Sequence, residues 1–440
     1  MVGPGRSRNR RSRRRTTDLG PAFATSPDAY REQPDRRRDR HALGCGRAGR
    51  CTLRSGCRGL LARASAHAGR CSRPRRRAQC VQSCSQCRQR PAVSQRRSAG
   101  GPARPRPHSA YCCQPVTLRY LSAADLDLAL PMASCIEAMR AVYKDSANAV
   151  PAERLFVPQP RATDTPDALL GVMPAGWAGH GFGAKIVSIV PDNPQHGRPG
   201  IQGVAVLLDA ETGTPRLITD AARLTTRRTA AMAGLATDHL ACPEARRLAV
   251  IGAGALAADM IAAMRAVRPI ETVKLHSRTR AKAESLADDL DLPAAVTATA
   301  DDAVADADVI VLCTTSPEPV VNDAALPPGT HVCAVGNFSA EGSELELVTV
   351  ARAAIWVDTF EGALTEAGEL IQAAARGLIP AGVDAIRGDL ATLANASGLL
   401  REAEYDLTLY KSVGDALADV GAMVWAERAA EADELGTLLN

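Results

Sequence analysis

A lysine in an aliphatic run is the most promising catalytic group of this chain. The chain contains five lysines, and Lys185 lies within Gly183–Val190, a run typical of a β-strand. On a strand its side chain shares one face with Val187 and Ile189. Burial of an ammonium group there lowers its pKa toward the range useful for proton transfer. The alternative is an edge strand, from which Lys185 extends into water.

Two arginines could hold a carboxylate, because a guanidinium group presents parallel donors to both carboxylate oxygens. Arg154 follows the turn 151–153, and Arg228 lies in Leu224–Ala231, where we expect a helix to begin. Isolated arginines are more often surface residues, so neither position identifies a site by itself. No metal is expected, because the histidines show no ligand spacing: His180, His196, His239, His276 and His331.

The glycine-rich turn at 252–257 is typical of a dinucleotide-binding site. It follows the apolar run Leu248–Ile251 and precedes a helical stretch that reaches about Val267. In such units the first glycine permits the tight turn, the second admits the pyrophosphate, and the third small residue allows helix–strand packing. The free N–H groups at the start of the helix would meet the phosphates. The predicted cofactor contacts here are Gly252, Gly254, Ala255 and Ala257.

The residues about 20 positions further on favour NADP(H) over NAD(H). An acidic residue at this distance normally accepts the ribose hydroxyls of NAD. This chain instead has Ser277, Arg278 and Thr279 after the run Val273–His276. A guanidinium group beside two hydroxyls suits a 2′-phosphate. If Arg278 is instead only a residue of a solvated loop, it would select neither cofactor. NAD(H) is therefore the alternative. Thr314, after the next central strand, would reach the same crevice.

Hydrophobic periodicity predicts the elements that position these groups. Leu121–Tyr143 has the period of an amphipathic helix, with Ser122 as a suitable N-cap. Turn residues then separate short strand-like runs, which predict an antiparallel or mixed sheet. These runs are Leu169–Met173, Phe182–Val190, Val204–Asp209 and Arg216–Thr219.

From Arg247 onward strands alternate with helical stretches, the pattern of a parallel, doubly wound sheet. The Ala-rich tail Leu409–Leu439 is expected to form a helix that packs on the first domain. We therefore predict an α/β protein with a Rossmann domain at 239–409 and a mixed-sheet α+β domain made of 116–238 with 410–440. The strands predicted for the Rossmann domain are Leu248–Ile251, Val273–His276, Ala295–Thr297, Val309–Cys313, His331–Val335 and Ile355–Val357.

Charge divides the chain near residue 115. Residues 1–115 hold 28 arginines, no lysine and five acidic residues, a net charge of +23. Residues 116–440 hold 25 basic and 43 acidic residues, a net charge of −18, which excludes nucleic-acid binding through their overall field. Their four scattered cysteines form neither a disulfide framework nor a zinc motif, which suits the cytoplasm. No apolar run approaches the roughly 20 residues that span a bilayer.

Residues 1–115 show no helix or strand period and few large apolar residues, so we expect a disordered extension. The functional alternatives are a transit peptide, a zinc site at Cys80, Cys84 and Cys87, or non-specific nucleic-acid binding. A secretory signal is not expected, because no apolar stretch follows the basic start. Arginine without lysine is also typical of a GC-rich gene read upstream of its start. We favour that interpretation and expect the functional chain to begin near Val116.

Several ordered motifs between about residues 117 and 425 resemble the ornithine cyclodeaminase/mu-crystallin family. They include Arg154 ahead of 170–175, Lys185 ahead of 191–194, the helix around Arg228, the glycine turn, and 411–414. The resemblance implies a homodimer joined through the first domain, which also binds substrate. It implies that both arginines bind the substrate carboxylate and that Lys185 handles the proton at the substrate nitrogen. It also implies that Ser412 lies near the nicotinamide.

Departures from the family pattern narrow the reaction. Phe338 stands where cyclodeaminases carry an aspartate that handles the second amine, and Leu256 replaces the glutamine of the family's glycine turn. Reduction of a preformed imine needs only a carboxylate clamp, a proton donor and a hydride. We predict an NAD(P)H-dependent reductase of small 2-imino acids of the pyrroline- or piperideine-2-carboxylate type. The alternatives are ornithine cyclodeaminase, an alanine-type amino-acid dehydrogenase, and a crystallin-like NADP(H)-binding protein with little catalysis.

Overall fold

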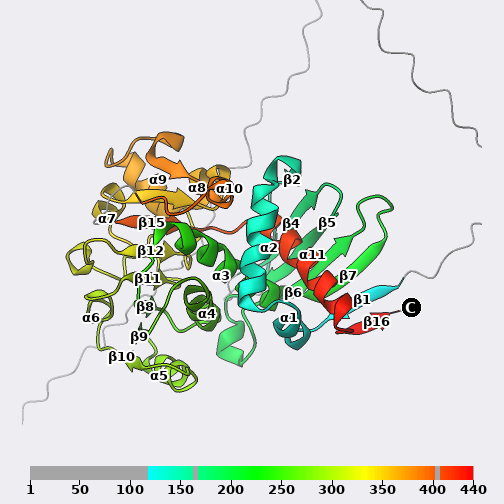
Figure 1. Cartoon of the computed structure of the whole chain (residues 1–440), viewed down its shortest axis with the longest axis horizontal. Helices are drawn as coiled ribbons and strands as arrows, with labels where there is room; N and C mark the ends of the chain where they lie inside the picture. The colour runs from blue at the N-terminus through cyan, green and yellow to red at the C-terminus, as the bar shows by residue number, and fades with distance from the viewer. Residues whose placement is uncertain (1–116, 162–166, 402–406, 440) are drawn as a thin grey trace, which may run out of the picture. The chain divides into compact units, whose positions relative to one another are not determined.

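Two eight-stranded sheets organise the part of the chain that the computed structural model describes, residues 117–439 without 162–166 and 402–406. The first sheet lies at the right of Figure 1 and the second at the left. The predictions for residues 1–115, including the disordered extension and its alternatives, lie outside the described residues.

The first sheet is mixed, as predicted. Its strand order is β16-β1-β7-β6-β5-β4-β2, and β3 also pairs with β4. All pairs are antiparallel except β1 with β7. The strands are β1 (Leu118–Leu121), β2 (Ala149–Pro151), β3 (Leu155–Gln159), β4 (Ala168–Trp177), β5 (Gly181–Ile189), β6 (Ile201–Leu208), β7 (Pro215–Asp220) and β16 (Thr437–Leu439).

Helices cover one face of this sheet. Helix α11 (Ala416–Ala432) packs against the strands, with α1 (Ala123–Ala129) and α2 (Met132–Lys144) beside it (Figure 1). The single helix expected over Leu121–Tyr143 is wrong, because Pro131 cannot continue a helix and separates α1 from α2. Ser122 caps α1 as predicted, in a capping box with Asp125.

The second sheet is parallel throughout, as the alternating pattern predicts. Its order is β10-β9-β8-β11-β12-β15-β13-β14, so the chain runs outward from β8 and then crosses back to β11. This reversal creates a crevice at the carboxyl ends of β8 and β11. The strands are β8 (Arg247–Ile251), β9 (Thr272–His276), β10 (Ala294–Val296), β11 (Val309–Leu312), β12 (His331–Ala334), β13 (Ala354–Val357), β14 (Ile386–Gly388) and β15 (Thr408–Lys411).

Helices lie on both faces of the second sheet, which makes it doubly wound. Alternate residues of β8 show this, because Leu248 and Val250 join one hydrophobic cluster while Ala249 and Ile251 join another. The helices are α4 (Ala257–Val267), α5 (Arg280–Asp288), α6 (Ala300–Val304), α7 (Leu347–Ala351), α8 (Phe360–Glu366), α9 (Gly368–Ala375) and α10 (Leu390–Asn395). Short 3-10 turns are η3 (Ser146–Asn148), η4 (Asn193–His196), η5 (Asp323–Ala325) and η6 (Gly382–Ala385).

Helix α3 (Ala221–Leu240) links the two sheets. It packs against α2 on one side and α4 on the other, and one hydrophobic cluster runs through all three. The chain returns to the first sheet only after Lys411, because Tyr410 and Lys411 still belong to β15. The helix expected over Leu409–Leu439 is therefore shorter, beginning at Ala416.

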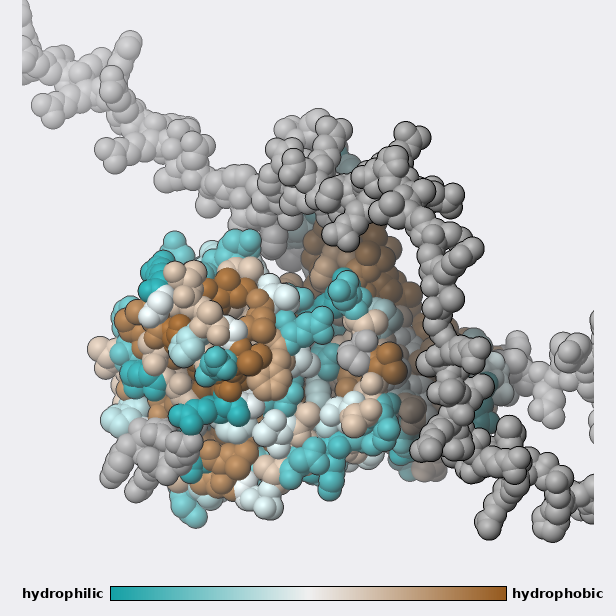
Figure 2. Space-filling view, turned by 90° about the horizontal axis from the view of Figure 1, so that it is seen from above, coloured by the Kyte–Doolittle hydropathy of each residue, from teal (hydrophilic) through white to brown (hydrophobic). Residues whose placement is uncertain are grey.

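On the part of the chain that the structure describes, exposed apolar side chains gather in two areas that bear on the argument. The first is the open face of the first sheet, where Leu170, Phe182, Ile186 and Val204 are exposed. The second surrounds α8 and α9, on the side of the molecule that Figure 2 shows, with Leu364 exposed. Among the described residues no helix is long and apolar enough to cross a bilayer.

Candidate active site

Lys185 occupies a central strand and is buried. Strand β5 lies between β4 and β6, so the edge-strand alternative is wrong. The lysine is 2% exposed and shares its face with Val187, which is also buried. This face packs against α3 and α11. Burial and the nearby Arg228 guanidinium lower the pKa of Lys185 from 10.5 to about 8, against the opposing effect of Asp419.

Asp419 of α11 joins Lys185 to Arg228 of α3. The lysine Nζ lies 3.0 Å from Asp419 Oδ2 and 3.3 Å from Oδ1. Arg228 Nε donates to Asp419 Oδ1 at 2.9 Å. Both cations and the carboxylate are almost fully buried. Two of the three predicted catalytic residues therefore meet on one buried anion.

Arg154 reaches the same region from the loop between β2 and β3. Its NH1 donates to Glu366 Oε2 at 3.0 Å and to the carbonyl of Val413 at 3.1 Å. Its NH2 donates to the carbonyl of Gly414. A Cβ at Gly414 would lie 2.8 Å from NH1 of Arg228, and the φ of this glycine is +85°. Gly414 therefore sits between the two arginines, where a larger residue would displace one of them.

The turn 412–414 is fixed by a buried carboxylate that directly follows β13. Asp358 Oδ2 accepts hydrogen bonds from Ser412 Oγ at 2.9 Å and from the N–H groups of Val413 and Gly414 at 2.8 and 2.6 Å. Asp358 is 1% exposed. The turn follows β15 at the carboxyl edge of the second sheet, so the arginines are brought to the edge where the glycine turn also lies.

A pocket of about 400 Å³ opens at this edge beside the glycine turn. Gly252 has a φ of +110°, and a Cβ there would lie 2.7 Å from the carbonyl oxygen of Cys313. A Cβ at Gly254 would meet nothing within 4 Å, so its backbone is open to a ligand. Helix α4 begins at Ala257, which is fully buried as helix–strand packing requires. These features fit a dinucleotide pyrophosphate.

Six of the nine predicted cofactor residues line this pocket. The lining includes Ser277, Arg278, Thr279 and Lys282, and none of the described lining residues is acidic. Three predicted residues do not line the pocket. These are Ala255 in the turn, Ala257 in α4, and Ser412, whose hydroxyl donates to Asp358. The six that line it are Gly252, Gly254, Ser277, Arg278, Thr279 and Thr314.

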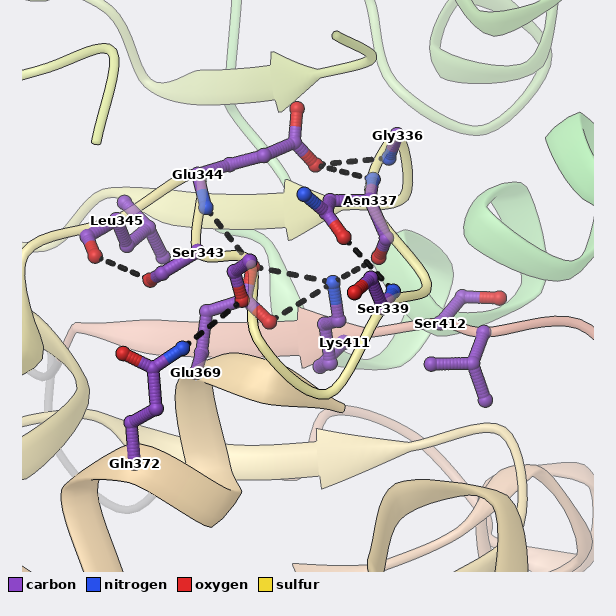
Figure 3. A network of polar contacts seen from close by, with 12 residues as sticks. Gly336, Asn337, Ser339, Ser343, Glu344, Leu345, Glu369, Gln372, Lys411 and Ser412 are labelled. Atoms are coloured by element: carbon purple, nitrogen blue, oxygen red, sulfur yellow. Dashed lines mark hydrogen bonds and ion pairs between the residues drawn. The ribbon is translucent and has the colours of Figure 1, made fainter. Parts of the chain in front are cut away.

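A second buried lysine organises the loop after β12 (Figure 3). Lys411 Nζ lies 2.9 and 3.1 Å from the two carboxylate oxygens of Glu369 and donates to the carbonyl of Asn337 at 2.6 Å. Glu344 accepts four hydrogen bonds, two from Thr314 and one each from the N–H groups of Gly336 and Asn337. Burial raises the pKa of Glu344. The network thus holds the strand ends that carry Thr314.

Sequence reasoning missed the carboxylates of the site. Asp419 is a lone acid in the apolar stretch 416–426, a signal that could have revealed a buried charge. Glu366, Glu369 and Asp358 lie among other polar residues, and no local pattern distinguishes them. Among the described residues no three His, Cys, Asp or Glu side chains form a cluster suited to a metal ion.

Comparison with known proteins then identifies the family. The model of the ornithine cyclodeaminase/mu-crystallin family matches residues 120–432. The chain belongs to this family. It is 36% identical over 279 residues to a Delta(1)-pyrroline-2-carboxylate reductase of Bacillus cereus, covering 61% of this chain and 84% of the relative.

Solved structures of family members have the same fold. The Thermococcus litoralis Delta(1)-pyrroline-2-carboxylate reductase, in complex with NADH and L-proline, superposes with a TM-score of 0.68 at 28% identity, covering 73% of this chain and 99% of that one. An archaeal alanine dehydrogenase dimer with bound NAD gives 0.66 at 26% identity, covering 74% and 99%. The two-sheet fold predicted from the sequence is therefore that of this family.

Proposed function

We propose that this protein is an NAD(P)H-dependent reductase of small 2-imino acids, of the pyrroline- or piperideine-2-carboxylate type. The observation that carries the proposal is the buried cluster in which Lys185 and Arg228 share Asp419, with Arg154 across Gly414. It offers a carboxylate clamp and one proton donor near the turn 412–414, which leaves the second sheet at the same carboxyl edge as the glycine turn. The related reductase and the related structure with L-proline support the same assignment.

Each group of the cluster has a part in the reduction. Arg228 and Arg154 bind the substrate carboxylate and orient the C=N bond. Lys185, whose pKa is about 8, is largely protonated at neutral pH and donates its proton to the imine nitrogen. Asp419 keeps the ammonium in place after desolvation. The nicotinamide, when bound, supplies the hydride that completes the conversion of C=N to C–N at C2.

The pocket residues favour NADP(H) as the preferred cofactor. Arg278 and Lys282 bring positive charge to the wall where the ribose would lie, together with the hydroxyls of Ser277 and Thr279. The related structures contain NADH or NAD, so NAD(H) is expected to be accepted as well. We expect Arg278→Ser to lower the preference for NADPH over NADH about tenfold, while Arg280→Ser, at the first residue of α5, leaves it unchanged.

The open face of the first sheet is the proposed homodimer interface. Leu170, Phe182, Ile186 and Val204 expose apolar side chains on adjacent strands, and such contiguous patches mark interaction sites. The related alanine dehydrogenase is a dimer. Sedimentation of the wild type and of a Phe182→Glu/Ile186→Glu variant tests this, with loss of the dimer expected for the variant.

Reduction of Δ1-pyrroline-2-carboxylate, followed as NADPH and NADH oxidation, tests the proposed function. The expected result is turnover that Lys185→Met lowers at least about 100-fold while cofactor binding persists. Lys274→Met, a change at a partly exposed lysine paired with Asp306, is the matched control and is expected to keep full activity. Cofactor binding without turnover of any 2-imino acid would contradict the proposal and favour the crystallin-like alternative. Ammonia release from ornithine with catalytic NAD⁺ would favour the cyclodeaminase.

A further inference from the structure

Glu366 neutralises one of the two arginines of the proposed carboxylate clamp. It ends α8, a helix whose Ala363 belongs to a hydrophobic cluster of the second sheet, and its Oε2 lies 3.0 Å from NH1 of Arg154. The pair is partly open to a ligand, since the side chain of Glu366 is 29% exposed and that of Arg154 is 16% exposed. Arg154 also donates to the carbonyls of Val413 and Gly414. Arg154 thus reaches the site already paired with an acid.

The charges of the cluster leave little room for a second anionic group on the substrate. Its three cations are Lys185, Arg154 and Arg228, and the carboxylates in direct contact with them are Asp419 and Glu366. Two further carboxyl groups lie nearby: Asp358, bonded to the turn 412–414, and Asp415, which accepts a hydrogen bond from Tyr143. The described residues of the site therefore offer no cation in excess of their carboxyl groups.

We infer that Glu366 is a specificity-determining residue that restricts the site to 2-imino acids with one carboxylate. The inference rests on the proposed function and deepens it by naming the charge of the substrate side chain. The two arginines of the clamp hold a single substrate carboxylate. A second carboxylate would meet the negative charge of Glu366, and like charges placed together in a desolvated site are strongly disfavoured.

The discrimination can be measured with two imines of similar shape and different charge. Ammonia forms imines with 4-methyl-2-oxopentanoate, which has one carboxylate, and with oxaloacetate, which has two, and their reduction products are leucine and aspartate. The wild type is expected to reduce the monocarboxylate with a kcat/KM at least about tenfold higher. Glu366→Gln is expected to shift this ratio toward the dicarboxylate by about tenfold. Glu366→Ser, a second neutral variant, is expected to shift it in the same direction.

Two controls isolate the charge at this position. Glu366→Asp keeps the carboxylate and is expected to retain the wild-type ratio. Glu361→Gln changes an exposed acid of the same helix and is expected to have no effect. Equal use of both imines by the wild type, or a ratio that neither neutral variant moves more than about twofold, would overturn the inference.

A binding measurement separates this inference from the proposed function. Calorimetric titration with L-leucine and L-aspartate in the presence of the oxidised cofactor needs no turnover. We expect wild-type affinity to favour L-leucine and Glu366→Gln to reduce that preference. If no imine, including Δ1-pyrroline-2-carboxylate, is reduced, the proposed function fails. The binding ratio then still decides the role of Glu366, because an unchanged ratio in Glu366→Gln contradicts it.

Discussion

Two buried lysines, one in each sheet, show how differently the same pair of charges can be used. Lys185 on β5 and Lys411 on β15 are 2% and 1% exposed, and each lies about 3 Å from a buried carboxylate. Lys411 has a second kind of partner, the carbonyl of Asn337, and its acid Glu369 also accepts from the N–H of Glu344. Within the described part of the chain, the Lys185 ammonium pairs with Asp419 alone and shares it with Arg228.

Burial of a lysine therefore does not by itself indicate catalysis. Lys411 is enclosed by acceptors, so its charge stabilises the loop after β12 (Figure 3). Lys185 faces a second cation, and this cation together with burial lowers its pKa to about 8 and makes its proton easier to give up. The lysine that shares its anion with an arginine is the one suited to proton transfer.

The largest expected effect breaks the pair at Lys185. Lys185→Met removes the proton donor, so kcat for imine reduction is expected to fall about 10²- to 10⁴-fold. Asp419 keeps Arg228 as a partner, so the free energy of unfolding should change less than in the corresponding Lys411 variant. Steady-state kinetics and urea unfolding measure both. A variant that retains more than about a tenth of the activity would argue against Lys185 as the donor.

Breaking the other pair should mainly destabilise the protein. Lys411→Met leaves the Glu369 carboxylate buried without its cation, and such changes cost about 3–5 kcal/mol in the free energy of unfolding. The double variant Lys411→Met/Glu369→Leu removes both charges and is expected to recover much of that loss. Urea unfolding checks both variants. If Lys411→Met is as stable as the wild type but inactive, the two lysines have exchanged roles.

The pH dependence of the reaction tests Lys185 as the proton donor. Reduction needs Lys185 protonated, so kcat/KM should fall about tenfold per pH unit above the pKa of about 8. Oxidation of L-proline needs the neutral amine and should fall below the same pH. Lys185→Arg, whose side chain stays charged, is expected to lose the upper limb. An upper limb that survives in Lys185→Arg would assign it to another group.

Asp419→Asn sharpens the comparison further. The carboxylate favours the charged form of Lys185, so its loss lowers the pKa of the lysine further. The upper limb of the reduction profile should therefore move to lower pH, while the profile of a Glu369→Gln variant should stay at the wild-type position. Identical shifts in both variants would show a general structural effect.

The two-sheet fold follows from patterns that local sequence carries. Strand–helix alternation after Arg247 and the turn at Gly252 predict the second sheet, and aliphatic alternation predicts β5 with its lysine. Pro131 indicates a break between two helices. The period of apolar residues continues on both sides of it, so a single helix was expected. Strand β15 is inserted between β12 and β13 although residues 358–407 separate it from β13 in the chain, an arrangement that long-range pairing decides.

The site was predictable in its cations and not in its anions. Lysine is scarce here, and the buried position of Lys185 follows from its own strand. Asp419, Glu366 and Asp358 act through contacts across 191, 212 and 56 residues of separation, and only folding brings them to the arginines and to the turn beside them. Those pairings set the charge of the site, so the sequence indicated the reaction more readily than the substrate.

The most direct test is a structure of the protein with oxidised cofactor and L-proline. The account predicts that Nζ of Lys185 lies within about 2.6–3.2 Å of the proline nitrogen, with the proline carboxylate on Arg228 and Arg154. A complex in which Lys185 stays enclosed on Asp419, with another side chain at the proline nitrogen, would contradict the account.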